Sequence, residues 1–144
     1  VKVGGENSSE VWSGFRVANR AKIIELKESE NEFVAAHNGY KKLGIIHQRR
    51  FEFSEKEIRV EDFIRGKALQ GVAYFHIHPA VTNVVFKDQT VQCPEFNLHM
   101  NFTGDKIKLE KSIYSWAESF NKTDEGILIK VLFTKELKTI INLK

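Results

Sequence analysis

Apolar and polar side chains alternate along Ala73-Tyr74-Phe75-His76-Ile77-His78. Because successive side chains of an extended strand point to opposite faces, this period of two predicts a strand with one buried face. Ile127–Phe133 and Ile107–Leu109 alternate in the same way. We therefore expect these segments to form the centre of the core, with Phe75, Ile77, Ile129, Val131 and Phe133 inside.

Further segments with this period recur at intervals of about 8–12 residues, which is typical of a β-sandwich or barrel. They are Ala21–Glu28, Glu32–Ala36, Gly44–Phe53, Ile58–Ile64, Thr82–Phe86, Gln89–Cys93, Asn97–Phe102 and Thr139–Leu143. Turn-forming residues separate many of them, as at Thr103–Asp105 and Lys122–Gly126. Only Ser112–Asn121 is a candidate for a short helix. The sequence predicts one all-β domain over residues 1–144, an antiparallel β-sandwich with little or no helix.

The composition is that of a folded domain. The chain has 144 residues, of which 42% are hydrophobic and 28% charged, so a sizeable core is possible and a disordered or collagen-like chain is excluded. One cysteine, Cys93, excludes an intrachain disulfide and a cysteine-rich zinc site. The net charge of +3 without a basic run does not indicate nucleic-acid binding, and no apolar run is long enough to span a membrane.

His76 and His78 are the strongest local indication of chemistry. At positions i and i+2 of a strand they project from one face about 7 Å apart, a spacing that suits two ligands of one metal. A third ligand would have to come from elsewhere in the fold, from His47, Glu95 or His99. The alternative is two polar side chains on the solvated face of a strand. We favour this alternative and predict no metal site.

A second cluster lies in the predicted strand Gly44–Phe53. There, His47 and Arg49 share a face with Phe51 and Phe53. A guanidinium and an imidazole beside aromatic rings suit a carboxylate or sulfate ligand, but they equally suit a sheet edge or a seam between two domains. We favour the sheet edge or the seam.

Two further segments carry candidate binding residues. Trp12 and Arg16 follow a polar lead, and an exposed Trp either stacks on a sugar ring or packs over an edge of the sandwich. His37 and Tyr40 flank an Asn-Gly pair, which predicts a hairpin turn. The sequence contains no nucleophile elbow and no phosphate-binding glycine loop, so we predict no catalytic residue.

Five segments, in order along the chain, resemble motifs of the heparinase II/III family of polysaccharide lyases. They are Gly5–Ala21, His37-Asn38-Gly39-Tyr40, His47-Gln48-Arg49, Phe75-His76-Ile77-His78-Pro79 and Tyr114–Asn121. The matches span nearly the whole chain, which therefore resembles the C-terminal, supersandwich-like β-sandwich of that family. Asn38 departs from the pattern, since the family usually has Asp at this position.

The resemblance implies a larger parent protein. Family members join an N-terminal α/α toroid to this sandwich and cleave acidic polysaccharides by β-elimination at a uronic acid. The toroid supplies the catalytic residues, and the ligands of a divalent metal, zinc or calcium where present, lie upstream of this segment. The resemblance thus implies no catalytic residue, no metal ligand and no cofactor within this chain, which is expected to be inactive alone. A free-standing carbohydrate-binding or structural module is the alternative.

The resemblance also implies partners, namely the toroid domain and, through the parent, an acidic polysaccharide. The residues expected at the substrate or at the domain interface are Trp12, Arg16, His37, Tyr40, His47 and Arg49. A degradative parent favours a periplasmic or secreted location, while a cytoplasmic one stays open.

Overall fold

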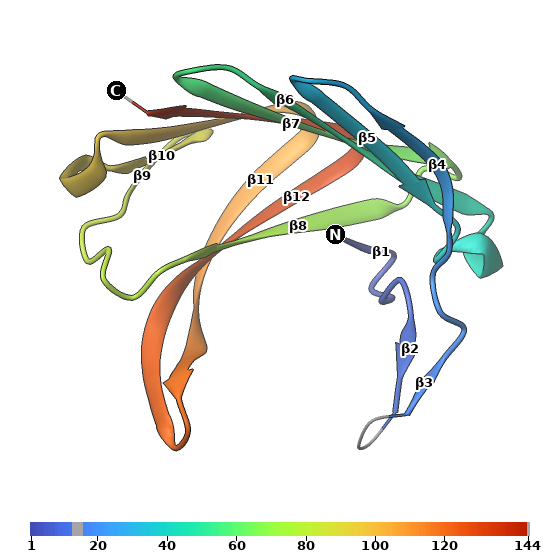
Figure 1. The fold of residues 1–144 in the computed structure, drawn as a ribbon, viewed down its shortest axis with the longest axis horizontal. Coiled ribbons are helices and arrows are strands. Elements are labelled where there is room, and N and C mark those ends of the chain that lie inside the picture. The colour runs from blue at the N-terminus through green and yellow to red at the C-terminus, as the bar shows by residue number, and fades with distance from the viewer. Residues whose placement is uncertain (13–15, 144) are drawn as a thin grey trace.

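Strands make up most of the computed structural model, which describes residues 1–12 and 16–143 (Figure 1). Residues 13–15, part of the segment that carries the first family motif, lie outside the described ranges. Ten strands form one antiparallel sheet and two form a small ribbon. The described residues contain two short 3-10 turns, no α-helix, and no helix long and apolar enough to cross a membrane.

The large sheet follows the order β4-β5-β6-β7-β12-β11-β10-β9, with β8 also paired to β12 and β1 to β8. The strands before the long hairpin are β1 (Lys2–Val3), β4 (Ile23–Glu28), β5 (Glu32–His37), β6 (Ile45–Phe53), β7 (Glu57–Gly66), β8 (Gln70–Ile77), β9 (Val85–Lys87) and β10 (Thr90–Cys93). The hairpin is β11 (Leu98–Ser119) and β12 (Lys122–Leu143), and the ribbon is β2 (Glu10–Val11) and β3 (Val17–Ala18). The 3-10 turns are η1 (Lys41–Leu43) and η2 (Pro94–Phe96).

The long strands β11 and β12 fold the sheet into two layers. β12 pairs with β8 over Ile127–Thr134 and with β7 over Glu136–Asn142. Between these stretches the register of β11 shifts near Asp105, and both Lys106 and Lys135 have positive φ. Such a bulge bends a strand pair and increases its twist, so the two ends of the hairpin enter different layers (Figure 1).

The core lies between these layers. Ile129, Val131 and Phe133 are almost fully buried, as the alternation predicts, and Phe75 and Ile77 pack half-buried against them. Other core side chains come from both layers, as in Val3, Tyr40, Ile45, Ile64, Val91, Phe102 and Leu137. The rings of Phe75 and Phe102 meet edge to face across the layers, with centroids 5.5 Å apart. The predicted all-β antiparallel fold is confirmed, with one folded sheet supplying both layers.

Several local predictions are wrong. Thr103–Asp105 is a bulge within β11 rather than a turn, because β12 continues beside it. Ser112–Asn121 is not a helix, since Ser112–Ser119 pairs with β12, as its aromatic content favours. Likewise Lys122–Gly126 begins β12 rather than forming a turn.

Two further differences concern loops. Asn38-Gly39 does not make a two-residue hairpin, because β5 and β6 are joined through η1 and Gly44. The C-cap residue Gly44 has φ +69°, a conformation that glycine adopts without strain. In Thr82–Phe86 only Val85 and Phe86 are extended, as part of β9.

Candidate functional site

Three neighbouring strands bring polar side chains together on the inner face of the sheet. In the register of β5 on β6, His37 lies opposite His47. In the register of β6 on β7, Arg49 lies opposite Asp62. Since residues two apart on a strand share a face, His47 and Arg49 point to the same side. We call His37, His47, Arg49 and Asp62 the inner polar cluster.

A chain of hydrogen bonds fixes the protons of both imidazoles. The Gly39 N–H donates to Nδ1 of His37 at 3.1 Å, so Nε2 of that ring carries the proton in the neutral form. This Nε2 donates to Nδ1 of His47 at 3.1 Å. In turn, Nε2 of His47 donates to Oδ1 of Asp62 at 2.8 Å. All four ring nitrogens are thereby engaged.

Asp62 is the anchor of the inner polar cluster. Its side chain is completely buried and accepts two hydrogen bonds from Arg49, from Nε at 2.8 Å and from Nη2 at 3.0 Å. Burial opposes ionisation of the carboxyl group, but the hydrogen bonds from His47 and Arg49 outweigh it and lower the pKa of Asp62 below its usual value. The cluster therefore holds a buried carboxylate with three donors.

His37 is held in its neutral form. Burial first, and then electrostatic interaction with the neighbouring His47, the Val1 amine and Arg49, lowers the pKa of His37 to about 4. A neutral ring is the form in which Nδ1 accepts and Nε2 donates, as the hydrogen-bond chain requires. At neutral pH this imidazole accordingly has no vacant nitrogen to accept a proton.

Tyr40 closes the cluster from the β5–β6 connection. Its ring lies 5.6 Å from that of His37, centroid to centroid, and its hydroxyl donates to the Val1 carbonyl. Burial and, to a smaller extent, the neighbouring Tyr74 raise the pKa of Tyr40 to about 12. A phenol with this pKa is a poor base at neutral pH.

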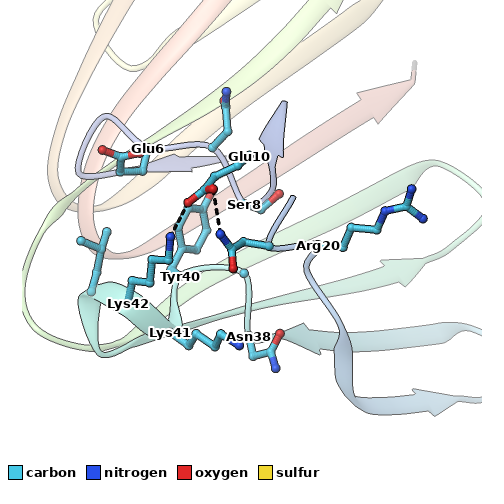
Figure 2. A pocket seen from close by; sticks show the side chains of 12 residues that line it. Glu6, Ser8, Glu10, Arg20, Asn38, Tyr40, Lys41 and Lys42 are labelled. Carbon is cyan, nitrogen blue, oxygen red and sulfur yellow. Dashed lines mark hydrogen bonds and ion pairs between the residues drawn. The ribbon is translucent and has the colours of Figure 1, made fainter. Parts of the chain in front are cut away.

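A polar hollow of about 250 Å³ lies beside Tyr40, between the start of the chain and η1 (Figure 2). Glu10 accepts hydrogen bonds there from Lys42 and from Asn19, and these contacts lower the pKa of its carboxyl group. The cations Arg20 and Lys41 also line the hollow. The wall of the hollow thus carries both acidic and basic side chains, and one of its cations, Lys42, is paired with Glu10.

The hydrogen bonds of the inner polar cluster join β5, β6 and β7 to one another, and they occupy the groups that could act as an acid or a base. Arg49 reaches toward solvent, with 31% of its side chain exposed and its guanidinium carbon 5.8 Å from the centre of the Phe51 ring. It can offer its free Nη1 to a carboxylate or sulfate while Asp62 neutralises its charge. Among the described residues, no three His, Cys, Asp or Glu side chains converge as a metal ion would require.

Solved structures similar to this chain include a heparan sulfate lyase and a heparinase III. Heparan sulfate lyase HepC from Pedobacter heparinus superposes with a TM-score of 0.67 at 17% identity, over 85% of this chain and 21% of the other. A heparinase III, the BT4657 gene product with methylated lysines, gives a TM-score of 0.70 at 13% identity, with the same two shares. At these identities the likeness shows the fold. The comparison with curated proteins gives no match.

A family model described as "Heparinase II/III-like, C-terminal" matches residues 1–142. The chain belongs to this family. As a heparinase II/III-like C-terminal domain, it spans about a fifth of the length of the solved lyases that it resembles.

The heparinase II/III-like fold brings together four of the six predicted site residues, His37, Tyr40, His47 and Arg49. The other two, Trp12 and Arg16, lie at the β2–β3 ribbon, where the Trp12 N–H donates to the Arg16 carbonyl. Both are exposed, Trp12 by 59%. In the described part of the chain, no side-chain hydrogen bond or ion pair joins them to the inner polar cluster.

His76 lies on the face of β8 that points away from the core, and His78 follows directly after β8 ends at Ile77. Each is exposed and meets an aromatic ring edge to face, His76 with Tyr114 at 4.8 Å and His78 with Trp116 at 5.1 Å between centroids. Nδ1 of His78 also accepts the Ala80 N–H at 3.1 Å. Both imidazoles therefore take part in packing against aromatic rings.

Sequence reasoning missed the central residue of the cluster, Asp62. The parity of β7 contains a signal, since Asp62 stands between Val60 and Ile64 on the apolar face of the strand. A carboxylate among core residues is rarely buried without partners. Identifying Arg49 as the partner of Asp62 requires the register of β6 on β7, which the local sequence does not give.

Proposed function

We propose that the chain is the C-terminal domain of a longer lyase, which cleaves a uronic-acid-containing acidic polysaccharide by β-elimination. An N-terminal α/α toroid carries the chemistry, and the present domain supports the catalytic cleft while being inactive alone. The family match over residues 1–142 supports this proposal, as does the correspondence of the chain to 21% of two lyase chains.

The observation that carries the inactivity of the isolated domain is the engagement of every ionisable group in the inner polar cluster. β-Elimination requires a base at the sugar carbon, an acid at the leaving oxygen and neutralisation of the uronate. The imidazoles of His37 and His47 use all their nitrogens, and the buried hydroxyl of Tyr40 is bonded to the Val1 carbonyl. Within the cluster, Arg49 is the cation that reaches toward solvent, and a guanidinium can bind an anion but cannot transfer a proton.

We assign a supporting role to the predicted site residues on this basis. The inner polar cluster keeps β5, β6 and β7 in register, and the exposed side chains of Trp12 and Arg16 are suited to contact the toroid or the polysaccharide. A partner on that side would cover the β2–β3 ribbon, whose apolar side chains Val11 and Val17 are exposed.

A free-standing carbohydrate-binding module is the second candidate. The exposed rings of Trp12 and Trp116 favour it, because an exposed indole can stack on a sugar ring. A module of this kind would bind polysaccharide without the upstream toroid.

The test is release of unsaturated uronate, followed by absorbance, from heparan, alginate and chondroitin-type substrates. We expect the full-length protein to release product from at least one of them and the chain of residues 1–144 to release none. Product formed by residues 1–144 alone, without added metal, would overturn the proposal. A full-length protein that binds these polymers but cleaves none would favour the binding module.

A further inference from the structure

One edge of β8 is only partly paired. β1 covers it at Gly71 and Val72, whereas β8 continues to Ile77. The Gly4 N–H donates to the Gln70 carbonyl, which fixes the direction of the backbone groups along this edge. Because these groups alternate in an antiparallel pair, Tyr74 and His76 direct their N–H and C=O groups to the same side as Gln70. No strand of the described residues pairs with that side of β8 beyond Val72.

An apolar groove of about 550 Å³ lies next to this open edge. Its floor is the inner face of β5, β6 and β7, and β8 forms its other side. The main aromatic side chains that line it are Phe33, Phe51, Phe53, Tyr74 and Phe75. The rings of Phe51 and Phe53 are stacked with centroids 6.1 Å apart, yet Phe53 is 46% exposed. An open strand edge beside exposed aromatic rings is a surface that proteins normally cover.

Val1 lies where a longer chain would enter this groove. The ladder of β1 places Val1 opposite Ala73, and the next position upstream would lie opposite Tyr74. The Val1 carbonyl accepts the Tyr40 hydroxyl and so points away from β8, as the alternation requires. The half-buried Val1 amine is also close to Arg49, and burial and this cation lower the pKa of the amine. A neutral peptide bond at this place would remove that repulsion.

We propose that, in the longer protein, the segment immediately preceding Val1 continues β1 along β8 as far as Ile77 and covers the aromatic groove. This inference rests on the proposed function, which places the chain at the end of a longer lyase. The ladder fixes the register. The residue before Val1 forms the hydrogen-bonded pair with Tyr74, and the second residue before Val1 lies opposite Phe75.

The register also predicts the character of the missing segment. Its second residue upstream shares a face with Val1 and Val3, both of which pack into the core. We expect this residue to be apolar and to lie between Phe75 and Phe51. Main-chain hydrogen bonds then hold the segment to β8, and the groove selects its side chains, as in strand addition generally.

The experiment is amide hydrogen exchange of the full-length protein, resolved to single residues over Gln70–Ile77. We expect the Tyr74 and His76 amides to exchange at least roughly tenfold more slowly than in the chain of residues 1–144, because the added strand accepts both. The Phe75 amide faces β12 and should be protected equally in both proteins. Tyr74 and His76 amides that exchange equally fast in the two proteins would overturn the inference.

Proline variants of the full-length protein test the register. Proline at the residue before Val1 removes a donor to Tyr74 and should accelerate exchange of the Tyr74 amide. Val1→Pro is the matched control, since the Val1 N–H points away from β8 in this register, and it should leave the Tyr74 amide slow. Equal effects of both prolines would refute the register.

Three other outcomes are also decisive. Protection of Tyr74 that appears in residues 1–144 and rises with protein concentration would assign the edge to a second copy and overturn the inference. Lyase activity is measured separately, so a protected edge without uronate release would contradict the proposed function alone. An active lyase with an unprotected edge would contradict only this inference.

Discussion

Asp62→Ala should destabilise the isolated chain strongly. The substitution removes a completely buried carboxylate that accepts three hydrogen bonds, from His47 and twice from Arg49. Breaking a buried ion pair by removing one partner costs about 3–5 kcal/mol, because the remaining charge is left uncompensated. For chains of about 150 residues each kcal/mol lowers Tm by roughly 2–4 °C, so we expect Tm to fall by about 6–20 °C.

The neighbouring residue provides the matched control. Glu61 has its side chain on the opposite face of β7, and its carboxylate lies 3.6 Å from the guanidinium of Arg50. Such partly exposed pairs are worth less than about 1 kcal/mol, so Glu61→Ala should change Tm little. Thermal unfolding followed by circular dichroism, with urea unfolding as a second probe, measures both variants. Equal losses for Asp62→Ala and Glu61→Ala would refute the reasoning.

The destabilisation by Asp62→Ala should also depend on pH, in a direction that follows from the pKa of Asp62. The folded pKa of Asp62 is lowered, so its carboxylate contributes stability above the ordinary aspartate pKa of 3.8, and this contribution is lost as the pH falls through the folded pKa. The difference in free energy of unfolding between wild type and Asp62→Ala should therefore be largest at neutral pH and shrink below about pH 4. A difference that grows on acidification would contradict the assigned charge state.

Two further predictions concern His37 and the core. The pKa of His37 falls from 6.5 to about 4 on folding, so the unfolded chain binds a proton that the folded chain does not, and stability should decrease as the pH falls through this interval. In denaturant titrations at several pH values, His37→Gln should show a smaller decrease, and an unchanged slope would be evidence against a neutral, half-buried ring. Phe102→Ala should cost about 3–5 kcal/mol because Phe102 is fully buried, and Phe75→Ala should cost less because Phe75 is half-buried. If urea unfolding gave the larger loss for Phe75→Ala, the packing between the layers would be wrongly described.

The strand pattern of the fold was predictable because alternation is a local signal. Its limits appear at Gly104, which has φ +149° and stands within a register shift. The residue types at this bulge are those that favour a turn. Only the pairing of β11 with β12 on both sides of the bulge shows that the strand continues. The same pairing makes a strand of Ser112–Ser119, whose local sequence left a short helix open.

The candidate site was predictable in part for the same reason. The shared face of His47 and Arg49 follows from the period of two and needs no knowledge of the fold. Their contact with Asp62 depends on the register of β7 on β6. The turn that joins these two strands, between Phe53 and Ile58, sets this register. Trp12 and Arg16 are expected from the sequence at the same substrate or domain interface as the cluster, but they lie at the β2–β3 ribbon, on an exposed part of the surface.

The central claim is that this domain supports a lyase without taking part in its chemistry. The most direct test is the turnover of the full-length protein carrying Arg49→Ala, measured on a cleaved polysaccharide well below the Tm of the variant. Arg50→Ala is the matched control, since Arg50 follows directly in β6 and pairs with Glu32 and Glu52 on the other face of the sheet. The account predicts a lower Tm for Arg49→Ala than for Arg50→Ala, with kcat of both variants within about threefold of wild type, a difference of less than about 1 kcal/mol in activation free energy. A loss of kcat by several orders of magnitude in Arg49→Ala at an unchanged Tm would place this guanidinium in the chemical step and contradict the claim.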